Sequence, residues 1–76
     1  MLNGSMAYID ATLSNSHDSH QFHIDADDMK ELMDIAYNVV SNTLYRIGKF
    51  NITSFNSNVM SMDHFNMLIE MRFHKK

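Results

Sequence analysis

Three histidines lie three residues apart, at His17, His20 and His23, and Asp18 follows the first of them. Imidazole nitrogens and carboxylate oxygens are donors that zinc, nickel and copper accept in proteins. On a strand, however, a spacing of three puts His20 and His23 on opposite faces. The chain also has no cysteine to complete a usual zinc pattern. We therefore predict no metal ligand and no cofactor, and keep a site at these three histidines as an alternative.

Two other pairs could transfer protons: His64 beside Asp63, and His23 two residues before Asp25. Adjacent residues of a strand point to opposite faces, so adjacency alone does not predict a hydrogen bond. With two glycines and no cysteine, the chain has no glycine-rich phosphate loop and no cysteine nucleophile. It is also short for a pocket of about 300 Å³ or more. We predict that the protein is not an enzyme.

The formal charge of −3 argues against a nucleic-acid footprint, which needs clustered cations. Weak binding of single strands by a sheet face stays open, with Tyr8 or Phe55 stacking on bases. The cations that would serve it are Arg46, Lys49, Arg72, Lys75 and Lys76. The absence of cysteine fits a reducing compartment, and no apolar run is long enough to span a membrane. We expect a cytoplasmic protein without a membrane partner.

The first half of the chain alternates apolar and polar residues. Apolar and polar residues alternate with period two over residues 7–14, which predicts a strand. Turn-forming residues at 14–19 and a second alternating stretch at 20–25 then predict a hairpin. Residues 1–5 have no period, and we interpret them as a disordered leader or a cloning remnant. The single predicted domain is then 6–76.

The middle of the chain has the period of a helix, which we predict over residues 26–47. Asp25 is the expected N-cap and Gly48 the expected C-terminal glycine. Apolar residues recur at spacings of three and four, as on a helix with one buried side. They are Met29, Leu32, Met33, Ala36, Val40, Leu44 and Ile47.

Alternation returns after the helix and predicts strands at 49–55 and 64–73, with a loop at 56–63 between them. The last stretch, FNMLIEMRF, alternates over nine residues. We thus predict an α+β fold: a four-stranded, mainly antiparallel sheet in ββαββ order, with one long helix on one sheet face. Strand order 2-1-3-4 satisfies full antiparallel pairing, and a mixed sheet in the order 1-2-3-4 is the alternative.

Such a fold leaves one sheet face uncovered, and we predict that this face binds a partner. Tyr8, Phe55, Leu68, Glu70 and Arg72 are its candidate contact residues. Carboxylates also gather at the helix start, where they complement the helix dipole or face a basic partner. These are Asp27, Asp28, Glu31 and Asp34.

No motif defines an activity, so the functional prediction depends on size and surface. A chain of 76 residues buries only about 60% of its unfolded surface, which favours association. We predict a small non-catalytic protein-binding module, a regulator or inhibitor that occludes a partner protein. Eight methionines and no proline suggest an AT-rich source such as a phage or mobile element. The alternative is a self-associating domain, a homodimer or other homo-oligomer paired through sheet faces or edges.

Overall fold

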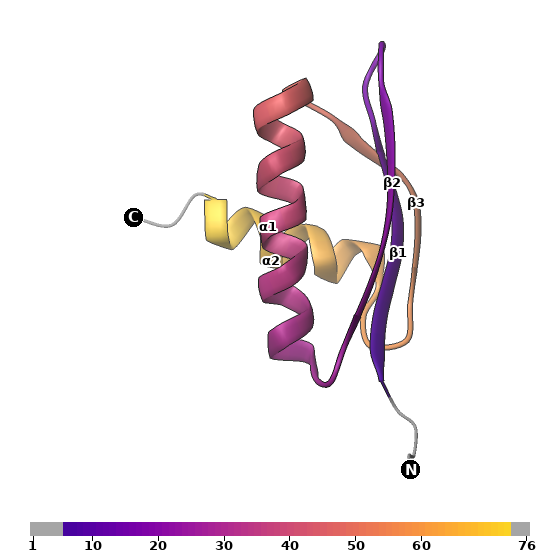
Figure 1. Ribbon diagram of the computed structural model, residues 1–76, viewed down its shortest axis with the longest axis vertical. Helices are drawn as coiled ribbons and strands as arrows, with labels where there is room; N and C mark the ends of the chain where they lie inside the picture. Colours follow the sequence, from indigo (N-terminus) through magenta and orange to yellow (C-terminus); the bar gives the residue numbers. More distant parts are fainter. Residues whose placement is uncertain (1–5, 74–76) are drawn as a thin grey trace.

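A computed structural model describes residues 6–73, so the predicted leader 1–5 and the tail 74–76 lie outside the described residues. Three antiparallel strands form a sheet in the order β2-β1-β3, and both helices lie on one side of it (Figure 1). The elements are β1 (Ala7–Ser14), β2 (Ser19–Ala26), α1 (Met29–Ile47), β3 (Asn51–Ser57) and α2 (Met62–Phe73).

The predicted first hairpin is confirmed, with β1 at its predicted bounds and β2 one residue longer at each end. Asn15 shapes the turn: its side-chain oxygen accepts the backbone N–H groups of His17 and Asp18 at 2.8 and 2.7 Å. Its amide nitrogen donates to the Ile47 carbonyl at 2.9 Å, which joins the turn to the end of α1. This short turn sets the hairpin register.

Strand β3 pairs with β1 but contains a bulge. Thr12 lies opposite Ser54 and Leu13 opposite Ile52, so Thr53 is the extra residue. The bulge shifts the alternation by one, and Ile52 and Phe55 therefore share the core face. The prediction that Phe55 lies on the open face is wrong for this reason.

Helix α1 begins three residues later than predicted. Ala26 is still paired in β2, opposite Ala7, and the N-cap is Asp28 rather than Asp25. The Asp28 carboxylate accepts the Glu31 backbone N–H at 2.9 Å, and the Glu31 carboxylate accepts the Asp27 backbone N–H at 3.1 Å. This reciprocal pairing resembles a capping box, which fixes the start of a helix. The predicted end is confirmed, because Gly48 follows Ile47 with φ +74°.

The predicted ββαββ order, four-stranded sheet and single long helix are wrong, since residues 62–73 form a second helix. Ser61 begins it: its hydroxyl accepts the His64 backbone N–H at 3.2 Å, and its carbonyl accepts the Phe65 N–H at 2.9 Å. Asp63 in the first turn suits the helix dipole. Ile69 is the only β-branched residue of this segment, so local propensity also favours a helix.

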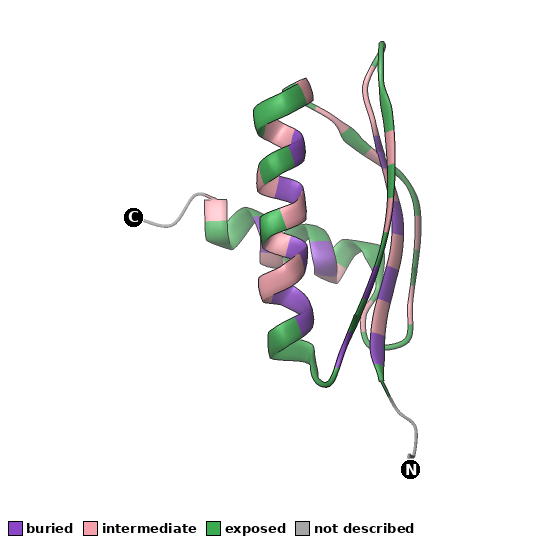
Figure 2. Ribbon diagram, viewed as in Figure 1, coloured by how far each residue is buried: buried purple, intermediate pink, exposed green. Residues whose placement is uncertain are grey.

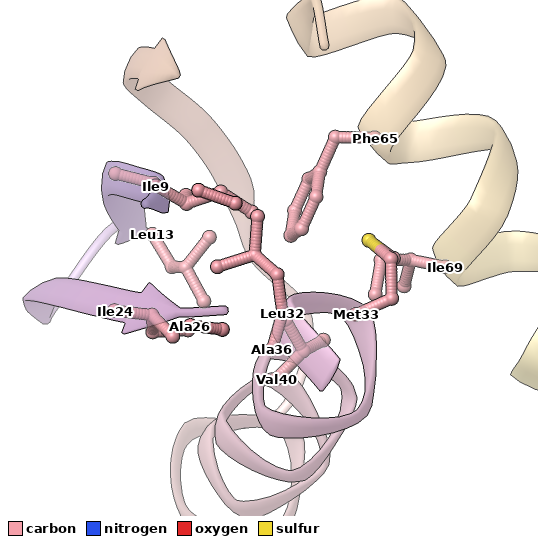
Figure 3. Packing of buried hydrophobic residues seen from close by; sticks show 12 residues of the cluster. Ile9, Leu13, Ile24, Ala26, Leu32, Met33, Ala36, Val40, Phe65 and Ile69 are labelled. Carbon is pink, nitrogen blue, oxygen red and sulfur yellow. The ribbon is translucent and has the colours of Figure 1, made fainter. Parts of the chain in front are cut away.

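The core lies between the sheet and the two helices, and buried residues alternate along β1 (Figure 2). Helix α2 supplies Phe65, which is 1% exposed, and Ile69. The Phe65 ring points between β1 and α1, and Ile69 lies beside Met33 (Figure 3). Phe65 also packs on Phe55 of β3, with ring centroids 5.2 Å apart. Helix α2 thus closes the part of the sheet that α1 leaves uncovered.

Candidate functional site

The face of the sheet away from the helices is polar and bonded to itself. Thr12 and Ser54 join β1 to β3 through a hydroxyl pair at 2.8 Å, and Ser14 and Thr53 form another at 3.2 Å. The Asn56 amide donates to the Tyr8 hydroxyl at 3.3 Å. These bonds between strands hold the face together.

On this open face, the ionisable ring of His23 is held through both of its nitrogen atoms. Its Nδ1 lies 2.5 Å from an Asp10 oxygen and its Nε2 lies 3.0 Å from an Asp25 oxygen. The Tyr8 ring stacks on it, with centroids 6.1 Å apart. Both ring nitrogens can donate only in the protonated imidazole, so hydrogen bonds to Asp10 and then to Asp25 raise the pKa of His23 above its ordinary 6.5.

The three histidines considered for metal binding are separated in space by the fold. His23 lies on the open face, whereas His20 points to the helix side. The Nε2 atom of His20 lies 3.3 Å from Nη1 of Arg46. His17 is in the hairpin turn. Across residues 6–73, no group of three or more His, Cys, Asp or Glu side chains has an arrangement that could hold a metal ion. The fold therefore does not bring these three histidines together as ligands of one metal site.

A groove of about 340 Å³ lies between the two helices and is lined by Met33, Leu68, Met71 and Arg72. Met33 belongs to α1 and the other three belong to α2. Helix α2 runs across α1 and away from the sheet, so only its first turns are covered by strands (Figure 1).

Methionines, most of them exposed, occur in pairs on both helices. Met29 lies one turn before Met33 on α1, and Met67 lies one turn before Met71 on α2, so each pair shares a helix side. Met67 is 52% exposed and Met71 62% exposed. We call this surface, formed by Met29, Met33, Met67, Leu68 and Met71, the methionine surface.

Arg72 closes one side of the groove through contacts with α1. Its Nη2 donates to Asp34 Oδ1 at 2.6 Å, and its guanidinium carbon lies 5.1 Å from the centre of the Tyr37 ring. Tyr37 in turn packs on Phe73 at 4.9 Å. The bond from Arg72 lowers the pKa of Asp34, and Lys30 contributes from 3.7 Å. These contacts fix the distance between the two helices.

The predicted contact residues fall into four separate places. Tyr8 is on the open face, Phe55 is in the core, and the four carboxylates from Asp27 to Asp34 are at the start of α1. Leu68, Glu70 and Arg72 are on α2 rather than on the sheet, because residues 62–73 are helical. The structure thus brings Asp34, Leu68 and Arg72 together at the groove.

Sequence reasoning missed the contribution of Met33, Tyr37 and Met71 to this site. A signal was present, because Met67 and Met71 have helical spacing and lie on a segment with a serine N-cap. Two of the cations weighed for nucleic-acid binding do not lie on the open face: Arg46 meets His20 and Arg72 meets Asp34. Lys75 and Lys76 lie outside the described residues.

Comparison of the chain with protein-family models, with curated proteins and with solved structures finds no match. Between residues 6 and 73, neither helix has the length and apolar character needed to cross a membrane.

Proposed function

We propose that this protein is a small non-catalytic protein-binding module, which acts as a regulator or inhibitor by covering a surface of a partner protein. The observation that carries this proposal is the methionine surface, in which Met33, Leu68 and Met71 line the groove. Met67 and Met71 remain more than half exposed on a helix that buries its opposite side. Exposed apolar clusters of this kind are typical of binding sites.

The groove has features of a protein interface and few features of a catalytic site. Its walls are thioether and aliphatic groups, which adapt to partner side chains of different shape. Its one lining cation, Arg72, is already bonded to Asp34. Partner binding would also add burial to the small core of a chain of 76 residues.

Affinity capture from a cell lysate tests the proposal if a groove variant is compared with a matched control. We expect Met71→Lys to lose the proteins that the wild type retains, because the substitution puts a charge on the groove wall. Tyr45→Lys is the control, since Tyr45 is 92% exposed and lies near the other end of α1. Recovery of the same proteins by all three forms, or of none by the wild type, would contradict the proposal.

Self-association is the second candidate, and the topology gives it a specific basis. Strands β2 and β3 each pair only with β1 among the described residues, so both edges of the sheet have unpaired backbone groups. A homodimer formed by edge pairing would use them. The phage or mobile-element origin and the cytoplasmic location remain predictions.

A further inference from the structure

The two edges of the sheet differ in how well they are protected against pairing with another strand. Strand β3 is interrupted by the bulge at Thr53. Strand β2 instead pairs with β1 in one unbroken register over all eight of its residues, and it contains neither proline nor lysine. Bulges, prolines and lysines are the usual devices that keep an edge strand from pairing. Among the described residues, β2 is therefore the edge that is open to another strand.

The contacts of β1 indicate which backbone groups of β2 face outward. The Tyr8 N–H donates to Asn58 at 3.0 Å, and the Thr12 carbonyl accepts the Thr53 hydroxyl at 3.4 Å, so Tyr8 and Thr12 direct backbone groups toward β3. Because this direction alternates along a strand, every other residue from Ala7 to Leu13 faces β2, and its partner in β2 faces inward. The remaining residues of β2 direct their N–H and C=O groups outward. These are Ser19, Gln21, His23 and Asp25.

A second, antiparallel copy of β2 matches these four residues in one register. With Phe22 opposite Phe22 of the second copy, Gln21 lies opposite His23, and Ser19 lies opposite Asp25. All four outward-facing residues then have a partner, and no two like charges lie opposite each other. A shift of two residues in one direction puts His23 opposite His23. The same shift in the other direction moves Asp25 past the end of the partner strand.

Half-buried apolar side chains lie beside this edge, on the helix side of the sheet. Phe22 belongs to β2, and Ile35 and Val39 belong to α1. Arg46 of α1 meets His20 of β2, which identifies the side of the helix that lies toward β2. Val39 and Ile35 lie on that same side, because they precede Arg46 by about two and three helical turns. A second copy paired through β2 would therefore cover apolar surface as well as backbone groups.

We propose that β2 pairs with β2 of a second copy, antiparallel and around a two-fold axis at Phe22, so that two sheets of three strands become one continuous sheet. This inference rests on the second candidate function, self-association, and specifies its interface. The two Phe22 rings would meet at the axis, and contacts between opposite aromatic residues stabilise strand pairing. The methionine surface takes no part, so failure of this inference leaves the protein-binding proposal intact.

Light scattering tests the dimer over protein concentrations from about 10 to about 500 µM, because a dimer forms by mass action. In about 300 mM salt, which screens repulsion between copies, we expect the mass to rise from near 8.8 kDa toward twice this value. Gln21→Pro removes an outward-facing N–H and leaves the bonds to β1 in place, so it should weaken the dimer at least about tenfold. Gln21→Ala keeps that N–H and should associate as the wild type does.

Cross-linking through single cysteines tests the register, because the chain has no cysteine of its own. Phe22→Cys puts both thiols at the axis, where opposite Cα atoms are about 4.5 Å apart, within the range of a disulfide. His20→Cys is the control, since its two copies are displaced by four residues, about 13 Å along the strands. We expect a mild oxidant to join Phe22→Cys into a dimer at least about tenfold faster than His20→Cys.

Each outcome supports or overturns the inference. A wild-type mass near 8.8 kDa at every concentration overturns it, and this result needs no variant to fold. Equal association of Gln21→Pro and wild type, or equal cross-linking of the two cysteine variants, overturns it as well, with circular dichroism as the check on folding. Loss of the dimer in Met71→Lys but not in Gln21→Pro would identify the groove as the interface.

The capture experiment separates this inference from the protein-binding proposal. A wild type that stays monomeric, but whose Gln21→Pro variant loses proteins captured from the lysate, would indicate that a strand of another protein occupies this edge and would overturn pairing with a second copy. The comparison of Met71→Lys with Tyr45→Lys decides the role of the methionine surface in either case.

Discussion

The charge of the His23 ring affects the pairing of β1 with β2, because the ring contacts two carboxylates. Because Asp10 lies on β1 and Asp25 on β2, the protonated ring joins both strands. The raised pKa of His23 means that its contribution to stability is complete below pH 6.5, its unfolded value, and is lost as the pH rises through its folded value.

We therefore expect the free energy of unfolding to fall as the pH is raised from about 6 to about 8. Urea denaturation at several pH values measures this slope. The variant His23→Asn should lose most of it, and His17→Asn, in the hairpin turn, should keep it. The same slope in His23→Asn and wild type would mean that other groups cause the pH dependence.

Sequence could predict the side of the sheet for single residues, but not their contacts. Period-two alternation correctly puts Tyr8, Asp10 and His23 on one face. The bond between Asp10 and His23 depends on the hairpin register, which the Asn15 turn sets. Phe55 was misplaced because one inserted residue, Thr53, reverses the alternation, and only the spacing of three between Ile52 and Phe55 indicated it.

At the scale of elements, β1, β2 and α1 could be predicted because each has one dominant period. Helix α2 could not, since its apolar residues fit two periods. Phe65, Met67, Ile69, Met71 and Phe73 share a face in a strand, but Phe65, Ile69 and Phe73 also share a side in a helix. Because α2 has apolar side chains on both sides, the alternation of a strand was the simpler pattern to recognise in the sequence. The groove was missed with it, because the groove exists only if residues 62–73 are helical.

Paired substitutions in α2 distinguish the helix from the strand. In the helix, Phe65 is buried and Met67 lies on the opposite, exposed side. We expect Phe65→Ala to reduce the free energy of unfolding by about 3–5 kcal/mol, and Met67→Ala to change it by about 0.5 kcal/mol or less. Chemical denaturation followed by circular dichroism measures both. Similar large losses for the two variants would indicate a strand, in which both side chains face the core.

For the whole molecule, the net charge determines how self-association should respond to salt. Each copy has a formal charge of −3, so two copies repel each other, and added salt screens this repulsion. We expect light scattering to give a mass near 8.8 kDa at low salt, and the dimer to increase as salt is added. A dimer that weakens with salt, or one that does not respond to it, would mean that the net charge does not control this association.

The exposure of Met67 and Met71 also makes the surface chemically sensitive. Thioethers are oxidised to sulfoxides, which are polar and can be reduced again by specific reductases. Because both side chains are more than half exposed, an oxidant reaches them without unfolding the protein. Mild peroxide treatment should therefore make this apolar surface polar and suppress the lysate capture expected from the proposed function, and enzymatic reduction should restore it. Under the proposed function, binding would then require reducing surroundings.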